Sequence, residues 1–275
     1  MKSWAKSKKS EWKKLAKTWA ALKPPWKPSN ERIKIYHEII KKHVKRKEAL
    51  LLGATPEIRD LLAKLKMKVT ILDISPSMIR AMTSLKKKKN EENIVIGNWL
   101  TTKLDKKYNL VIGDSVVNNL SLKQVNRFFQ QVKGFLKDDG IFICQIAVIA
   151  KPLEKISIST DDIIEKARKR PAYYKSYVNR AYDYCQWSVL HRRNKIINWG
   201  ELNEIYRHKL KNKEISKKEF KLLDFNLPDD VRMLFLTKQE FEKMINPFWN
   251  IIEEKYEKEH KVSKDFYRIY ILKPR

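Results

Sequence analysis

The chain is poor in cysteine. It contains only Cys144 and Cys185 in 275 residues. Neither has a C-x-x-C partner or the histidine spacing of a zinc site, and two distant cysteines do not make a disulfide framework. We therefore expect no metal site and a reducing environment, the cytoplasm. Cys144 falls in an apolar run, where it is expected to be a small buried hydrophobic residue rather than a nucleophile.

Long apolar runs are also missing. No stretch approaches the roughly 20 apolar residues that span a bilayer. Lysines interrupt the N-terminus, where a signal peptide would need an unbroken apolar segment. The sequence predicts no membrane span, which agrees with a cytoplasmic protein.

Acidic residues are scarce relative to basic ones. The chain contains 60 Lys and Arg residues and 32 Asp and Glu residues, which gives a net charge of +28 and a pI near 9.9. This excess indicates RNA or another anionic partner, because clustered cations neutralise phosphate. It also agrees with compositional drift, since most of the excess is lysine. The sequence leaves both interpretations open. A hydrophobic content of 43% is enough for a substantial core.

A β-α-β unit between residues 47 and 77 organises the chain. An apolar run at 49–52 is typical of a buried parallel strand, and a turn at Gly53 follows it. Thr55 is placed to cap a helix that begins at Pro56. A second apolar run at 69–72 ends in Asp73, about 20 residues after the glycine, where a carboxylate accepts hydrogen bonds from ribose.

The turn of this unit lacks the G-x-G-x-x-G pattern of a dinucleotide site. Only Gly53 is present, Pro56 has no N–H to donate, and Glu57 places a negative charge where a pyrophosphate would bind. These residues argue against a nicotinamide enzyme. A ligand with a ribose, a positive charge and no phosphate fits better, and S-adenosylmethionine has these properties.

The residues that follow resemble a known family. LLGATPEIRDLL (51–62) and VTILDISPSMI (69–79) are similar to the first two motifs of class I S-adenosylmethionine-dependent methyltransferases. The first motif resembles a subgroup with G-A-T-P-E in place of the glycine-rich loop. IVIGNW (94–99), YNLVIGDS (108–115) and GFLKDDGIFICQI (134–146) resemble the next three strand motifs. The similarity covers about residues 48–149, with a weaker tail at 234–274.

This resemblance implies an α/β fold: a doubly wound, mostly parallel seven-stranded sheet of the Rossmann-like methyltransferase type. Strands are expected at 49–52, 69–72, 94–96, 110–113, 141–149, 249–256 and 266–272. Helices are expected at 29–46 and 122–136, and from Thr237 to Met244. We divide the chain into an N-terminal helical lid (1–46), a cofactor-binding core (47–149), a helical insertion (150–232) and the C-terminal part of the core (233–275).

The resemblance also implies the residues that contact S-adenosylmethionine and its product S-adenosylhomocysteine. Asp73 would bind the ribose, and Asn98 and Trp99 would lie against the adenine. The family often has an acid where this chain has Leu51, and Asp where it has Asn98. The implied cofactor residues are Gly53, Ala54, Thr55, Pro56, Glu57, Asp73, Ile74, Met78, Asn98, Trp99, Asp114 and Ser115.

Asp114 is the candidate general base or orienting group, with Asn118 behind it. The Asn/Asp-Pro-Pro-aromatic signature of amino-methyltransferases is absent, because Ser115 and Val116 follow Asp114. Methylation of an exocyclic base nitrogen by that route is therefore disfavoured. We expect methyl transfer to an unassigned acceptor, a small molecule or RNA. The alternative is a non-catalytic basic RNA-binding protein that keeps the fold.

The two flanking segments allow several interpretations. Trp12, Leu15, Trp19 and Leu22 follow helical spacing up to Pro24. This helix could cover the cofactor site, lie on an anionic membrane or stack on bases. The insertion mixes cations and rings that suit either an anionic partner or the packing of an ordinary helical subdomain. These residues are Arg168, Arg170, Tyr173, Tyr174, Tyr177, Arg180, Arg192 and Arg193.

Overall fold

A mixed, mostly parallel sheet forms the centre of the molecule. The computed structural model describes residues 12, 18–224 and 231–275. Seven strands follow the order β3-β2-β1-β4-β5-β10-β9, and the short β8 pairs with β5. Five neighbouring strands are parallel, and β10 is antiparallel to both β5 and β9. The sheet strands are β1 (Glu48–Leu52), β2 (Lys68–Asp73), β3 (Glu92–Ile96), β4 (Tyr108–Asp114), β5 (Leu136–Ile149), β8 (Leu236–Thr237), β9 (Trp249–Lys255) and β10 (Tyr267–Pro274).

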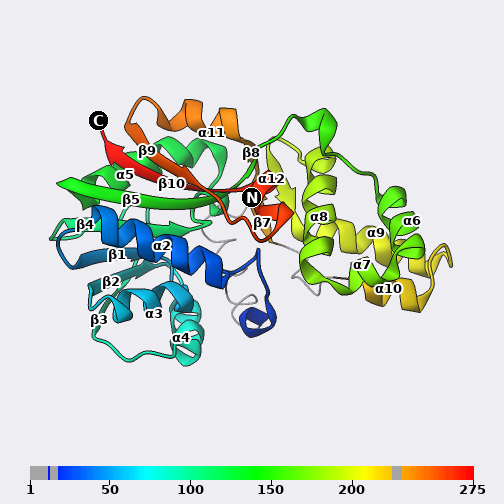
Figure 1. The fold of residues 1–275 in the computed structure, drawn as a ribbon, viewed down its shortest axis with the longest axis horizontal. Coiled ribbons are helices and arrows are strands. Elements are labelled where there is room, and N and C mark those ends of the chain that lie inside the picture. Colours follow the sequence, from blue (N-terminus) through cyan, green and yellow to red (C-terminus); the bar gives the residue numbers. More distant parts are fainter. Residues whose placement is uncertain (1–11, 13–17, 225–230) are drawn as a thin grey trace.

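Both faces of this sheet are covered by helices (Figure 1). In β1, Leu51 packs in one cluster with Tyr36 and Ile58, which belong to the helices α2 and α3. Leu50 faces the opposite way and packs in a second cluster with Phe128 of α5. Burial on two sides explains why the strands are almost continuously apolar rather than alternating. The helices that flank the sheet are α2 (Asn30–His43), α3 (Pro56–Lys64), α4 (Pro76–Leu85), α5 (Val125–Phe135), α11 (Lys238–Ile245) and α12 (Lys261–Phe266).

The segment between β5 and β8 forms a helical body beside the sheet (Figure 1). Its buried residues, among them Tyr174 and Trp187, belong to the same apolar cluster as one face of the sheet. The short strands β6 and β7 pair with each other at its base. The elements of this segment are α6 (Thr160–Lys169), α7 (Pro171–Lys175), α8 (Tyr177–His191), β6 (Ile196–Asn198), α9 (Trp199–Lys211), α10 (Lys217–Leu223) and β7 (Arg232–Leu234).

Four short 3-10 helices complete the described structure. They are η1 (Trp19–Ala21), η2 (Val117–Asn119), η3 (Leu122–Gln124) and η4 (Leu153–Lys155). Most of the expected N-terminal helix lies outside the described residues, so its helical form stays a prediction. Among the described residues, no helix is both long and apolar enough to cross a membrane.

The expected core elements are confirmed, with corrections at their ends. The helix expected at 122–136 is the 3-10 turn η3 followed by α5, and β5 begins at Leu136 rather than Ile141. Phe266 ends the short helix α12 instead of starting the last strand, and α12 itself was not expected. Thr55 precedes α3, but its side chain makes no capping hydrogen bond. The side chains of Ser29 and Thr237 do cap α2 and α11.

Most of the insertion's cations and rings serve internal contacts. Arg168 binds Glu219, with 2.6 Å between Nε and Oε1, and Arg180 donates to the carbonyl of Asp224 at 2.8 Å. Tyr174 is buried and donates to Asp183. These contacts favour the helical subdomain over a nucleic-acid surface. The division of the chain into four parts stays a prediction.

Candidate functional site

A first cavity lies at the carboxyl ends of β1, β2 and β4, with about 420 Å³ of empty space that includes the solvent at its mouth. Parallel strands present their carboxyl ends at one edge, and ligands of doubly wound sheets bind there. The described residues that line it are Trp12, Trp19, Leu52, Gly53, Ala54, Thr55, Asp73, Met78, Met82, Trp99, Asp114, Val116 and Asn119. Seven of the twelve expected cofactor residues, including Asp114, therefore line this cavity.

Asp73 ends β2 and is 5% exposed. Its Oδ1 accepts a hydrogen bond from the backbone N–H of Ser75 at 2.7 Å. Burial raises the pKa of Asp73 to about 6, and the Ser75 hydrogen bond opposes this shift. The carboxylate is thus held in a desolvated position that donors such as ribose hydroxyls would stabilise.

Gly53 and Trp99 shape the rest of this wall. Gly53 has φ +89°, a conformation that side-chain-bearing residues rarely adopt, and its N–H donates to the carbonyl of Leu72 at 3.0 Å. The indole N–H of Trp99 donates to the same carbonyl at 2.7 Å, which fixes the ring beside the turn. Trp99 therefore presents an aromatic surface to the cavity, in the position expected for a group that contacts adenine.

Several expected cofactor residues lie elsewhere. Asn98 is not among the described residues that line the first cavity, and its Oδ1 accepts from the N–H of Leu100 at 2.9 Å. This hydrogen bond stabilises the turn after β3, and the expected contact of Asn98 with adenine stays a prediction. Pro56, Glu57 and Ile74 are also not among the described lining residues, and Ser115 lines only a neighbouring cavity.

A second cavity adjoins the first, with about 820 Å³ of empty space that includes the solvent at its mouth. The two share Thr55, Asp114 and Asn119 from the core and Trp12 and Trp19 from the N-terminal segment. The second cavity extends from this junction to the insertion. Its other described lining residues are Leu22, Pro25, Trp26, Pro28, Ser115, Asn118, Ala147, Tyr184, Cys185, Ser188, Ile197, Trp199, Val231, Met233, Leu234, Phe235 and Tyr267.

Asp114 stands at the junction and is paired with Arg32 of α2. Arg32 Nη1 lies 3.1 Å from Asp114 Oδ1, and Arg32 Nη2 lies 2.7 Å from Glu257 Oε2. All three side chains are almost fully buried. Burial raises the pKa of Asp114, and the positive charge of Arg32 opposes the shift. Arg32 holds this carboxylate in an ion pair. Of the two expected roles of Asp114, this geometry favours the orienting and electrostatic group over the free general base.

Asn118 has a structural role. Its Nδ2 donates to the carbonyls of Ala147 at 2.9 Å and Leu234 at 2.8 Å, and its Oδ1 accepts from the N–H of Ala147 at 2.9 Å. Both amide hydrogens of Asn118 are used in these bonds, so the side chain has no hydrogen left to donate to a substrate. The expected catalytic role of Asn118 is therefore corrected: it joins η2 to β5 and β7.

Cys144 is fully buried in β5, and burial raises the pKa of its thiol well above the usual range. Its expected role as a small core residue is confirmed. Within residues 12, 18–224 and 231–275, no group of three His, Cys, Asp or Glu side chains is arranged to hold a metal ion.

Sequence reasoning missed Arg32, Glu257 and the aromatic residues Trp26, Tyr184 and Trp199 of the second cavity. Arg32 and Glu257 are 225 residues apart, so no local pattern connects them. Met82 had a usable signal, because it follows Met78 by one helical turn and lines the same cavity.

Comparisons with known proteins agree with this geometry. Residues 52–144 match the family model described as "Methyltransferase domain". The chain contains a class I S-adenosylmethionine-dependent methyltransferase domain. Its activity is the transfer of a methyl group from S-adenosylmethionine, and the match does not identify the acceptor. No curated protein sequence matches the chain significantly.

Solved structures share the fold of this methyltransferase at low identity. A S-adenosylmethionine-dependent methyltransferase from Clostridium acetobutylicum is 13% identical, with a TM-score of 0.58 over 95% of this chain and 98% of its own. The N-methyltransferase NodS from Bradyrhizobium japonicum, in complex with S-adenosylhomocysteine, is 9% identical, with a TM-score of 0.53 over 96% and 98%. A structure from Rhodobacter sphaeroides described as putative Zn-dependent alcohol dehydrogenases is 12% identical, with a TM-score of 0.60 over 98% and 99%. At these identities the likeness concerns the fold alone.

The first cavity suits S-adenosylmethionine. Asp73 and Asp114 both line it, so its wall carries carboxylates for a ligand that has hydroxyl donors and positive charge. An added Cβ at Gly53 would be in van der Waals contact with Trp99 at 3.9 Å and Asp73 at 4.0 Å, so a side chain here would lie against the two residues expected to contact adenine and ribose. When bound, S-adenosylmethionine supplies a methyl group on an activated sulfonium. The methyltransferase must then hold an acceptor in line with that methyl group.

Proposed function

We propose that this methyltransferase acts on a small molecule held in the second cavity. The observation that carries the proposal is the junction of the two cavities at Asp114, since methyl transfer needs cofactor and acceptor to meet at one point. Aromatic and aliphatic side chains dominate the wall of the second cavity, which suits a compact, largely apolar acceptor. An open cavity pair also supports catalysis over a non-catalytic scaffold.

Each part of the site has a role in this proposal. Asp73 accepts hydrogen bonds from the ribose, and the ring of Trp99 lies against the adenine. Asp114, held by Arg32, faces the reacting groups. Trp12 and Trp19 line both cavities, which supports the N-terminal segment as their cover. We further propose membership of the G-A-T-P-E subgroup and a cytoplasmic location, the latter on the two unpaired cysteines.

The first experiment is calorimetric titration with S-adenosylmethionine, S-adenosylhomocysteine and NAD. We expect the two adenosyl-sulfur ligands to bind and NAD not to bind. Incubation with methyl-labelled S-adenosylmethionine and a cell extract then tests the acceptor. Label in the small-molecule fraction supports the proposal, and label confined to RNA would overturn it.

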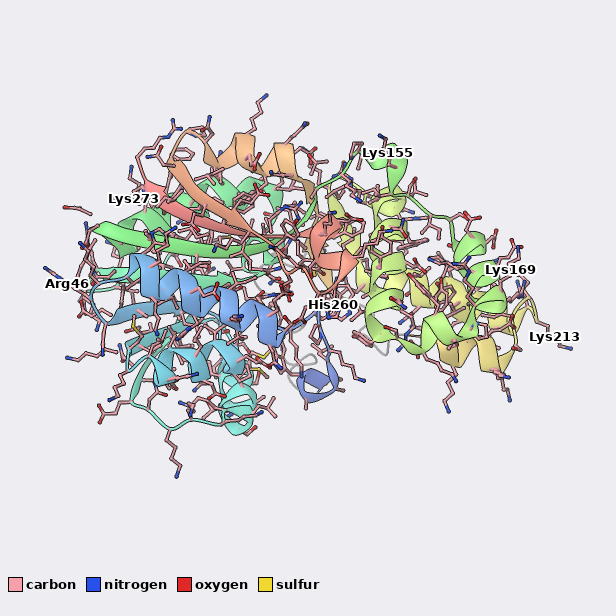
Figure 2. All side chains as sticks on the ribbon, in the orientation of Figure 1. Arg46, Lys155, Lys169, Lys213, His260 and Lys273 are labelled. Carbon is pink, nitrogen blue, oxygen red and sulfur yellow. The ribbon has the colours of Figure 1, made fainter. Side chains whose placement is uncertain are left out.

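A separate observation supports an anionic partner. The segments that precede β1, β2, β3 and β4 all reach the edge of the sheet opposite the cofactor cavity, because these strands are parallel. We propose that this edge, called here the basic edge, binds the RNA backbone. Figure 2 labels Arg46 there, at the end of the molecule away from the insertion. The basic edge comprises Lys45, Arg46, Lys47, Lys64, Lys66, Lys68, Lys87, Lys88, Lys89, Lys103, Lys106 and Lys107, all exposed.

Acidic residues at this edge are fewer. Glu91 and Asp105 lie in the same segments, Glu48 and Glu92 begin β1 and β3, and Asp60 of α3 accepts hydrogen bonds from the backbone N–H groups of Lys87 and Lys88. The test is RNA binding as a function of salt for a variant in which Lys47, Lys68, Lys106 and Lys107 become Gln. We expect its affinity to fall and the slope of log K against log salt to decrease by as much as about 3. The matched control carries the same change at Lys155, Lys169, Lys211 and Lys217. Equal losses in both variants would show that total charge, not the basic edge, determines binding.

A further inference from the structure

The second cavity combines a ring cluster with a carboxylate. Trp26 contacts Tyr184, with 5.6 Å between ring centroids and an angle of 78°, and Trp199, with 4.8 Å and 53°. All three rings line the cavity, and Tyr184 and Trp199 are buried. Asp114 lies where this cavity meets the first one. Desolvated ring faces attract cations, and the adjacent carboxylate adds to that attraction.

The charges around Asp114 do not cancel. Arg32 supplies one positive charge, whereas Asp114 and Glu257 supply two negative charges. Asp114 lies on the cavity wall, and Arg32 is not among the described lining residues. Ser29 and Ser263 donate hydrogen bonds to Glu257, which fixes the far side of the cluster. An acceptor in the second cavity therefore meets the negative member of the cluster first.

The excess of negative charge around Asp114 favours some methyl acceptors over others. A phenolate, thiolate or carboxylate would lie beside a buried carboxylate, and like charges in a desolvated site repel strongly. A neutral amine is not repelled by the carboxylate, and its nitrogen gains positive charge as it reacts. The surrounding wall groups stay neutral, because burial raises the pKa values of Tyr184, Tyr267 and Cys185. Stabilisation of developing charge is what accelerates the reaction.

We propose that the acceptor atom is the neutral amine nitrogen of a small apolar molecule. This inference rests on the proposed function of the second cavity. The nitrogen lone pair forms the new N–C bond as the C–S bond breaks, and the bonding pair returns to sulfur. The positive charge moves from sulfur to nitrogen, beside Asp114 and the rings of Trp26, Tyr184 and Trp199. A proton on the ammonium product then leaves to water.

The test compares matched probes on the full chain saturated with S-adenosylhomocysteine. The probes are benzyltrimethylammonium, its neutral isostere neopentylbenzene, and the anion benzenesulfonate. We expect the cation to bind at least tenfold more tightly than either of the others, measured by calorimetry. Equal binding of cation and isostere, or tighter binding of the anion, would overturn the amine assignment. Failure to bind S-adenosylhomocysteine at all would instead overturn the proposed cofactor site.

Two variants locate the effect. Asp114→Asn should reduce the preference for the cation at least fivefold, and Trp199→Leu should also reduce it. Asp161→Asn, at a carboxylate that is 82% exposed on the insertion, is the matched control and should leave the preference unchanged. If a variant does not fold, the comparison of the three probes on the unmodified protein still tests the proposal.

The pH dependence of turnover is a second test. With a hydrophobic amine as substrate, kcat/KM should rise with pH through the pKa of that amine, and a flat profile would contradict the proposal.

Discussion

Asp73 is subject to two opposing effects, because its proposed binding of the ribose needs a charged carboxylate, whereas burial in the folded protein disfavours that charge. With a folded pKa of about 6, above the ordinary 3.8, the carboxyl destabilises the folded state at neutral pH. This cost is relieved as the pH falls from about 6 to about 4. We expect Asp73→Asn to stabilise the ligand-free protein at pH 7.5 by about 1–3 kcal/mol. Urea unfolding at pH 7.5 and pH 5 measures this, and the gain should shrink at pH 5.

The same substitution should weaken binding. Loss of a charged hydrogen bond to the ribose reduces the affinity for S-adenosylhomocysteine by at least about fivefold, or ~1 kcal/mol. In the unmodified protein the affinity should fall as the pH drops through 6, since protonated Asp73 accepts hydrogen bonds poorly. Asp105→Asn, an exposed control, should change neither quantity. Unchanged affinity in Asp73→Asn would place the ribose elsewhere.

Arg32 is the residue on which the buried charges depend. Arg32→Met leaves Asp114 and Glu257 buried without their cation, which typically costs about 3–5 kcal/mol. We expect a loss of this size in urea unfolding. Arg193→Ala is the comparison, because Arg193 is 86% exposed and lies 3.6 Å from Glu201. Its loss should stay below about 1 kcal/mol. A small loss in Arg32→Met would mean that the carboxylates take up protons without difficulty.

At the scale of elements, the N-terminal segment connects the two cavities. Trp19 lines both of them, so Trp19→Ala should weaken the binding of S-adenosylhomocysteine and of the acceptor together. We expect losses of about tenfold in the cofactor affinity, because a partly buried indole face is removed from the wall. Calorimetry of Trp19→Ala beside Lys23→Ala, an exposed neighbour, measures it. A loss for only one ligand would confine Trp19 to one cavity.

Elements with strong local signals were predictable from the sequence. Strands buried on both faces, such as β1 and β4, appear as apolar runs, and the caps at Ser29 and Thr237 are local. The six-residue helix α12 carries too little periodicity to be recognised. In the site, Asp73 and Gly53 follow from the β-α-β pattern. The role of Asn118 was misjudged because an amide side chain reveals its partners only in the folded structure.

At the scale of the whole molecule, the two binding sites that we propose lie at opposite edges of one sheet. Parallel strands send their carboxyl ends to the cavities and their amino ends to the basic edge. Figure 2 shows Arg46 at one end of the molecule and Lys169 and Lys213 of the insertion at the other. The basic edge thus holds part of the lysine excess, and it is remote from the proposed acceptor site.

Separation of the two edges predicts that their ligands bind independently. The strands β1, β2 and β4 between them are almost fully buried and continuously paired, which gives no second packing arrangement that either ligand could favour. Coupling requires states that a ligand binds with different affinity. We therefore expect saturating S-adenosylhomocysteine to change RNA affinity by less than about twofold, measured by fluorescence anisotropy at fixed salt. The glutamine variant at Lys47, Lys68, Lys106 and Lys107 should keep the calorimetric affinity for S-adenosylhomocysteine. A strong effect of S-adenosylhomocysteine on RNA binding would place the RNA at the cavities, and RNA would then return as the methyl acceptor.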